Sequence, residues 1–134
     1  MTTKARFGNQ FPTQSVILPY VKSLYQEAID FYHKTKCKCY EWQLNMLKAF
    51  MAVEDDGLWG HQKFGYAIPR RNGKTEVVYI MELWALENGL STLHTAHRIS
   101  TSHSSFEKLT KYLEDSGYVQ GEAFNSIKAK GQER

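Results

Sequence analysis

The chain has 134 residues, 42% of them apolar, so it is long enough for one globular domain with a real core and too short for two ordinary domains. Its 17 basic and 14 acidic residues leave a net charge of +3, which excludes a densely basic protein whose composition alone would indicate nucleic acid binding. No run approaches the roughly 18 apolar residues that cross a bilayer, and the start lacks the apolar core of a signal peptide, so we expect a soluble cytoplasmic protein without membrane contact.

Two helices are expected in the first part of the chain. Residues 1–19 form a polar N-terminal segment without a pattern, and we expect residues 20–134 to form a single domain. Apolar residues at helical spacing predict a helix over residues 21–32 with one buried face. A second stripe predicts another helix, which ends at the turn EDDG and is marked by Leu44, Leu47 and Met51.

The middle of the chain has the order of strand, loop, helix and strand. The stretch KFGYAIP, residues 63–69, is short, aromatic and apolar and stops at a proline, which suits a buried strand. Residues 75–87 are apolar on nearly every face, which predicts a helix packed on several sides, with Asn88 and Gly89 as its stop. Residues 91–96 are expected to form a second strand.

A last helix is expected around Phe106, Leu109 and Leu113, ending near Gly117, and residues 125–134 show no evident terminal element.

The order of the middle elements predicts the fold class. A strand, a glycine-bearing turn, a helix and a second strand make up the βαβ order of a parallel sheet. We therefore expect an α/β fold: a P-loop NTPase-like parallel sheet flanked by helices, preceded by two helices and incomplete, as the N-terminal portion of such a domain.

A candidate phosphate-binding loop lies between the first expected strand and its helix. Its end, Gly73, Lys74 and Thr75, supplies a glycine for close backbone approach, a lysine for phosphate charge and a hydroxyl for Mg²⁺ at a helix start. The triplet alone is weak evidence, and its place between a strand and a helix strengthens it. Ile68 stands where the usual pattern has its first glycine, so the loop is a deviant one. A solvated basic turn that caps the helix is the alternative.

The loop sequence PRRNGKT, residues 69–75, resembles the deviant loop of the large terminase subunits of tailed bacteriophages. Upstream, YEWQ, residues 40–43, resembles the adenine-recognition element of this family, in which a glutamine pairs with the adenine edge. Downstream, TAHRISTSHSSFEKL, residues 95–109, resembles the segment that follows the second strand. The resemblance covers the chain from about residue 40 onward and concerns the N-terminal part of the family's ATPase domain.

The resemblance implies an ATPase that uses ATP and Mg²⁺ and assigns roles to residues of the loop. Lys74 and Arg70 would be catalytic, stabilising the charge of the transferred phosphoryl group, and Thr75 would hold Mg²⁺ through its hydroxyl. The expected nucleotide-binding residues are Gln43, Pro69, Arg70, Arg71, Asn72, Gly73, Lys74 and Thr75. Gln43 would recognise adenine, although a glutamine near a helix start also commonly caps the helix.

The resemblance further implies partners and a place of action. In such a motor, ATP hydrolysis drives double-stranded viral DNA into a procapsid, with a small terminase subunit and a portal protein as partners. The full-length protein would form a ring-shaped homo-oligomer on the procapsid, working in the host bacterial cytoplasm and transiently at the portal.

Two parts of the family pattern are missing from the sequence. The apolar strand that ends in Asp-Glu, which would help to hold Mg²⁺ and activate water, is not found after Ala96, and the C-terminal nuclease domain is absent. We therefore expect an N-terminal piece of such a protein, from a broken gene or a split reading frame. By itself it should bind nucleotide weakly and hydrolyse it poorly if at all.

Other functions remain open on the sequence alone. A helicase that pairs an upstream glutamine with a GKT loop is one, although its loop usually carries small residues where PRRN stands. A non-catalytic module that binds DNA or a partner protein and contains GKT by chance is another. A truncated chain without function is the third.

Overall fold

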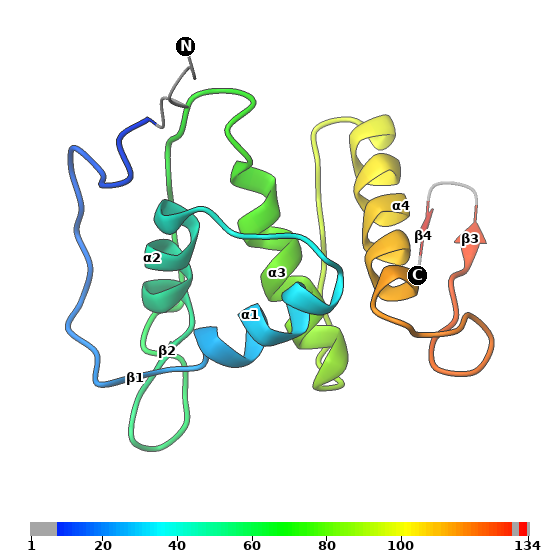
Figure 1. Cartoon of the computed structure of the whole chain (residues 1–134), viewed down its shortest axis with the longest axis horizontal. Coiled ribbons are helices and arrows are strands. Elements are labelled where there is room, and N and C mark those ends of the chain that lie inside the picture. The colour runs from blue at the N-terminus through cyan, green and yellow to red at the C-terminus, as the bar shows by residue number, and fades with distance from the viewer. Residues whose placement is uncertain (1–7, 130–131, 134) are drawn as a thin grey trace, which may run out of the picture. The chain divides into compact units, whose positions relative to one another are not determined.

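A computed structural model describes residues 8–129 and 132–133 of the chain. These residues form four helices and two short antiparallel strand pairs (Figure 1). The chain divides into two compact units. The first unit combines the residues up to Gln26 with Cys39–Val77, and the second combines Glu27–Lys38 with the residues from Val78 onward.

The first unit is built on one helix and one strand pair. Helix α2 (Glu41–Phe50) is followed at once by β2 (Ala52–Val53), which pairs antiparallel with β1 (Lys22–Ser23). Part of this stretch is buried: Leu47 and Met51 are fully so, and Ala49, Ala52 and Val53 are buried as well. This unit also contains the start of helix α1 (Tyr25–Lys34) and the first turn of helix α3 (Lys74–Glu87).

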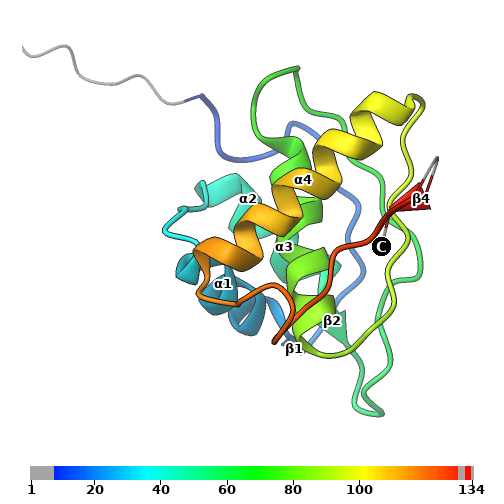
Figure 2. The ribbon, with the colours of Figure 1, turned by 90° about the vertical axis from the view of Figure 1, so that its right-hand side faces the viewer.

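The second unit holds most of α1 and α3 together with helix α4 (Ile99–Asp115). Figure 2 shows α4 lying across α3. The Tyr112 ring of α4 meets Tyr32 of α1 edge-on at 5.7 Å and Tyr79 of α3 at 6.2 Å, so aromatic contacts join the three helices. The strands β3 (Lys128–Ala129) and β4 (Gln132–Glu133) form a second antiparallel pair.

The expected helices are confirmed, with shifted starts. Helix α3 matches the apolar stretch of residues 75–87, and the main-chain N–H of Leu90 donates to the carbonyl of Ala85 at 2.8 Å while Gly89 has φ 68°. This is a glycine stop of the Schellman type, which satisfies the carbonyls at the end of the helix. Helix α4 contains Phe106, Leu109 and Leu113 and ends at Asp115, close to the expected end near Gly117, and it begins at Ile99.

The prediction of a parallel sheet is wrong. The described residues contain only two-stranded antiparallel sheets, so the chain is mostly helical and not a parallel P-loop sheet flanked by helices. Neither residues 63–69 nor residues 91–96 form a strand. A strand exists only where a neighbouring strand accepts its hydrogen bonds, and a local pattern does not reveal whether that neighbour is there.

The aromatic residues of the first expected strand are used in a different way. Phe64 stacks on Phe50 of α2 with ring centroids 4.3 Å apart, and Tyr66 contacts the same ring at 5.6 Å. Residues 63–69 are therefore held on the first unit by side-chain packing instead of main-chain pairing. Within residues 91–96, the apolar side chain of Leu93 is 89% exposed. In a buried strand this side chain would be covered.

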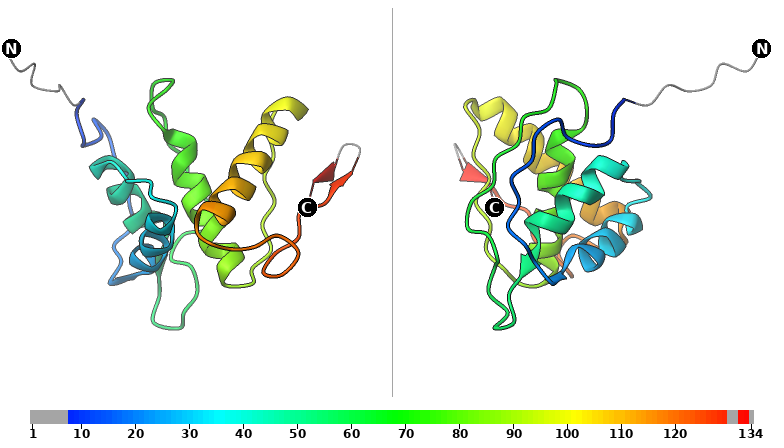
Figure 3. Two further views of the ribbon diagram at one scale, coloured as in Figure 1. Left: turned by 45° about the vertical axis from the view of Figure 1, so that its right-hand side comes forward. Right: turned by 90° about the vertical axis from the view of Figure 1, so that its left-hand side faces the viewer.

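Two further differences concern short elements. The helix that was expected to run to residues 54–57 stops at Phe50, and β2 follows it. Residues 125–134, without an expected element, contain β3 and β4. Of the polar segment 1–19, residues 1–7 lie outside the described residues, and the part from residue 8 onward contains no helix or strand (Figure 3).

Among the described residues, no helix has both the length and the apolar composition that a membrane crossing requires.

Candidate phosphate-binding site

The phosphate loop, Pro69 to Thr75, lies in the first unit and leads directly into α3, which begins at Lys74. Two of its residues have the left-handed backbone conformation: Arg71 with φ 63° and Gly73 with φ 75°. Glycine adopts this conformation freely, whereas a non-glycine residue does so rarely and at a cost. Arg71 is therefore held in a strained conformation, and such strain persists only where the surrounding contacts hold it.

Asn72 closes the loop on itself. Its side-chain amide donates to the carbonyl of Pro69 at 3.1 Å and to the carbonyl of Arg70 at 3.3 Å. Both bonds reach back over two or three residues, which is how asparagine side chains commonly stabilise tight turns. The loop thus has an internal clamp that does not depend on a neighbouring strand.

Gln43 anchors the carboxyl end of the loop to α2. Its side-chain amide donates to the carbonyl of Gly73 at 2.9 Å, and its side-chain oxygen accepts the main-chain N–H of Tyr40 at 2.8 Å. The second bond is one half of a capping box at the start of α2. Gln43 is only 2% exposed, so both bonds are made in a buried setting. The helix-capping alternative for this glutamine is thus observed, and its contact with adenine stays a prediction.

Tyr66 holds the next residue of the loop. Its hydroxyl donates to the carbonyl of Lys74 at 2.9 Å. Burial raises the pKa of the Tyr66 phenol above its ordinary value, so the group remains a proton donor at neutral pH. Consecutive carbonyls, those of Gly73 and Lys74, are therefore each bound by a side chain from elsewhere in the first unit.

The charged side chains of the loop face solvent. Arg70, Arg71, Lys74 and Thr75 are exposed, and within the described part of the chain none of the three cations forms an ion pair. The main-chain N–H groups of Lys74 and Thr75 lie in the first turn of α3, where a helix offers them no carbonyl. Unpaired N–H groups, a helix amino end and three unpaired cations together favour an anion.

The expected nucleotide-binding residues therefore lie in one unit. Pro69 to Thr75 are continuous, and Gln43, thirty residues earlier, contacts the loop directly. The catalytic roles expected for Lys74 and Arg70, and the Mg²⁺ role of Thr75, stay predictions. Sequence reasoning missed Tyr66, which it placed in a strand. A tyrosine eight residues before a helix start has no signal that would have identified it.

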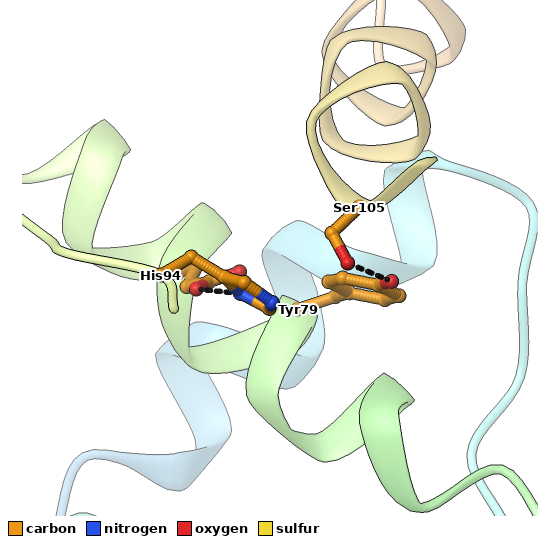
Figure 4. Close-up of polar contacts among 4 residues, drawn as sticks. Tyr79, His94 and Ser105 are labelled. Carbon is orange, nitrogen blue, oxygen red and sulfur yellow. Dashed lines mark hydrogen bonds and ion pairs between the residues drawn. The ribbon is translucent and has the colours of Figure 1, made fainter. Parts of the chain in front are cut away.

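A second polar cluster, also missed, lies in the second unit. His94 Nδ1 is 2.7 Å from a carboxylate oxygen of Glu82 on α3, and Glu82 is 7% exposed. The Tyr79 ring stacks on the His94 ring with centroids 6.2 Å apart, and the Tyr79 hydroxyl donates to the Ser105 hydroxyl at 3.0 Å. Figure 4 shows Tyr79 between His94 and Ser105.

This cluster attaches the chain after α3 to the helix. The second carboxylate oxygen of Glu82 is buried and has no hydrogen-bond partner among the described residues. Burial raises the pKa of Glu82, and the hydrogen bond from His94 opposes that shift. The hydroxyl of Ser105 is bound by Tyr79 and not by the histidine, so the cluster lacks the nucleophile and base pair of covalent catalysis.

A scan against protein-family models, a search of curated proteins and a search of solved structures found no match to this chain. Its function is therefore inferred from its own residues and their geometry.

Proposed function

We propose that this chain binds Mg²⁺-ATP through its phosphate loop, as the nucleotide-binding part of a DNA-packaging ATPase of the large terminase type. The observation that carries the proposal is the loop itself. It is clamped internally by Asn72, tied to the unit at the carbonyls of Gly73 and Lys74, and left with its cations unpaired.

The binding proposal does not require a parallel sheet. In the usual arrangement a strand holds the start of a phosphate loop, and no strand of the described residues does so here. The side chains of Gln43 and Tyr66 supply support of another kind, because each fixes one carbonyl at the start of α3. With those carbonyls directed to the protein, the N–H groups of Lys74 and Thr75 remain for the phosphate oxygens.

Each loop cation has a proposed role. Lys74, at the first position of α3, would contact the β- and γ-phosphates, and the neighbouring Thr75 hydroxyl would coordinate Mg²⁺. Arg70 would stabilise charge on the transferred phosphoryl group. Arg71 adds a positive charge that favours the polyphosphate over a neutral ligand. The proposed partners of the motor are double-stranded viral DNA, a small terminase subunit and a portal protein, and its place of action is the host cytoplasm at the procapsid portal.

The first test is a titration of the protein with Mg²⁺-ATP by calorimetry, on the wild type and on Lys74→Ala. Hydrogen bonds to charged groups contribute about 1.5–3 kcal/mol each, so the substitution should weaken binding about 10- to 100-fold. The matched control is Lys63→Ala, which removes an exposed lysine of the same unit outside the loop and should leave affinity unchanged. Absence of binding to the wild type at millimolar Mg²⁺-ATP, or equal affinity of wild type and Lys74→Ala, would refute the proposal.

A further inference from the structure

The buried amide of Gln43 is already occupied in the structure. Its oxygen accepts from Tyr40 at 2.8 Å and its nitrogen donates to the Gly73 carbonyl at 2.9 Å, and the residue is 2% exposed. A side chain that recognises an adenine edge needs a free acceptor and a free donor that face the ligand. One lone pair and one amide hydrogen of Gln43 are used by the helix cap and the loop, and at 2% exposure the remaining lone pair and hydrogen are shielded from a ligand.

The contact with Gly73 is close as well as polar. A Cβ placed on Gly73 would lie 3.1 Å from the Gln43 amide nitrogen, so a glycine is what lets the two approach. Gly73 also needs its left-handed conformation, with φ 75°, to turn the chain into α3. The same carbonyl of Gly73 accepts the main-chain N–H of Glu76 at 3.2 Å, so Gln43 adds a second bond to the group that starts the helix.

We propose that Gln43 is a positioning residue for phosphate binding, which acts through the Gly73 carbonyl and does not read the base. This inference rests on the proposed function of the loop. By fixing the Gly73 peptide group, Gln43 orients the N–H groups of the residues that follow it. Its loss should therefore weaken binding of the phosphate chain itself, whatever base is attached.

The test compares three ligands with Mg²⁺: ATP, GTP and inorganic triphosphate, which has no base. Gln43→Met keeps the volume and the neutral charge of the side chain and removes both hydrogen bonds. We expect its affinity for all three ligands to fall together, about five- to tenfold, with the ratio of ATP to GTP affinity unchanged. Gln43→Glu keeps an oxygen for the Tyr40 N–H, loses the donor to Gly73 and adds a negative charge, so it should lower triphosphate affinity at least as much as Gln43→Met.

A second measurement follows the loop in the ligand-free protein. Trypsin cleaves after exposed arginines, and its rate at a site follows how often that segment opens. Gln43→Met should speed cleavage after Arg70 and Arg71 several-fold and leave cleavage after Lys38 unchanged. The matched control is Gln62→Met at an exposed glutamine of the same unit, which should change neither binding nor cleavage.

The outcomes separate this inference from the function on which it rests. If the wild type binds none of the three ligands, the proposed function and the role of Gln43 both fall. If the wild type binds and the Gln43 variants bind equally well with unchanged cleavage, only the role of Gln43 falls. A loss of ATP affinity with triphosphate affinity intact would show that the side chain reads the base, which overturns the inference as well.

Discussion

At the scale of single residues, Gly73 is the position where two requirements meet. Its φ of 75° is in the region that glycine tolerates, and its missing side chain leaves room for the Gln43 amide at 3.1 Å from where a Cβ would stand. Lys74 and Thr75 are proposed to select the ligand of the loop, whereas Gly73 determines whether the loop can have its shape. The two kinds of contribution can be separated by experiment.

Gly73→Ala should destabilise the protein by about 1–2 kcal/mol, since a side chain in the left-handed conformation costs that much. The Gln43 amide would also have to move by a few tenths of an ångström to make room for the new Cβ. Urea unfolding followed by circular dichroism measures the change. Gly65→Ala is the control, because a Cβ at Gly65 meets no heavy atom within 4 Å. Equal stabilities of the two variants would show that the turn at Gly73 is not under this constraint.

Glu82 gives the second residue-scale prediction, which concerns pH. Burial raises its pKa above the ordinary value near 4.5, so the folded protein retains the proton after the unfolded chain has lost it. The folded state then binds more protons than the unfolded state, and the free energy of unfolding falls as pH rises from about 4.5 through the raised pKa.

The variant Glu82→Gln carries no charge at any pH and should not show that loss. The difference in melting temperature, variant minus wild type, should therefore become more positive between pH 4 and pH 7. Thermal unfolding at both values, in buffers of equal ionic strength, measures it. A difference that becomes more negative over this range would mean that the bond to His94 outweighs the cost of burial.

At the scale of elements, α3 is the helix whose apolar sequence corresponds most directly to buried side chains. Val77, Ile80 and Leu83 along it are fully buried, whereas Leu86 near its end is 45% exposed. The helix is apolar on nearly every face, and its amino end forms part of the phosphate loop. A helix that is buried this deeply depends on packing more than on helix propensity.

Leu83→Ala should cost about 2–5 kcal/mol, because it removes a fully buried side chain and leaves a cavity. Leu86→Ala is the same substitution one turn onward on the same helix, and it should cost less than about 1 kcal/mol. Chemical denaturation of both variants measures the two values. Comparable losses would mean that Leu86 is covered in solution.

The elements also show which predictions local sequence can support. Helices α3 and α4 are specified by spacing and by glycine stops, both of which lie within the element or next to it, so the sequence was sufficient to place them. A strand needs a partner from elsewhere in the chain. Residues 63–69 and 91–96 had strand-like composition, but Phe64 packs on Phe50 and His94 binds Glu82, and main-chain pairing does not form.

At the scale of the whole molecule, the fold class could not be predicted for the same reason. The βαβ order was inferred from two strands that do not form. The prediction of a parallel sheet was therefore wrong, although the prediction of the helices was confirmed. The loop residues could be singled out because the pattern is a short contiguous stretch, and their role in nucleotide binding stays a prediction. Of the two side chains that support the loop, Gln43 was singled out from the sequence for another role, and Tyr66 was not singled out.

The bond between Gln43 and Gly73 spans thirty positions of the chain, so the loop conformation depends on a residue far from it in sequence. A synthetic peptide of residues 63–87 would contain every basic group of the motif and the whole of α3, yet it would lack the amide that fixes Gly73. Such a peptide should attract polyphosphate only as a flexible cation does, with an affinity that added salt abolishes. We therefore expect an ordered anion site only in the folded chain, and not in the motif by itself.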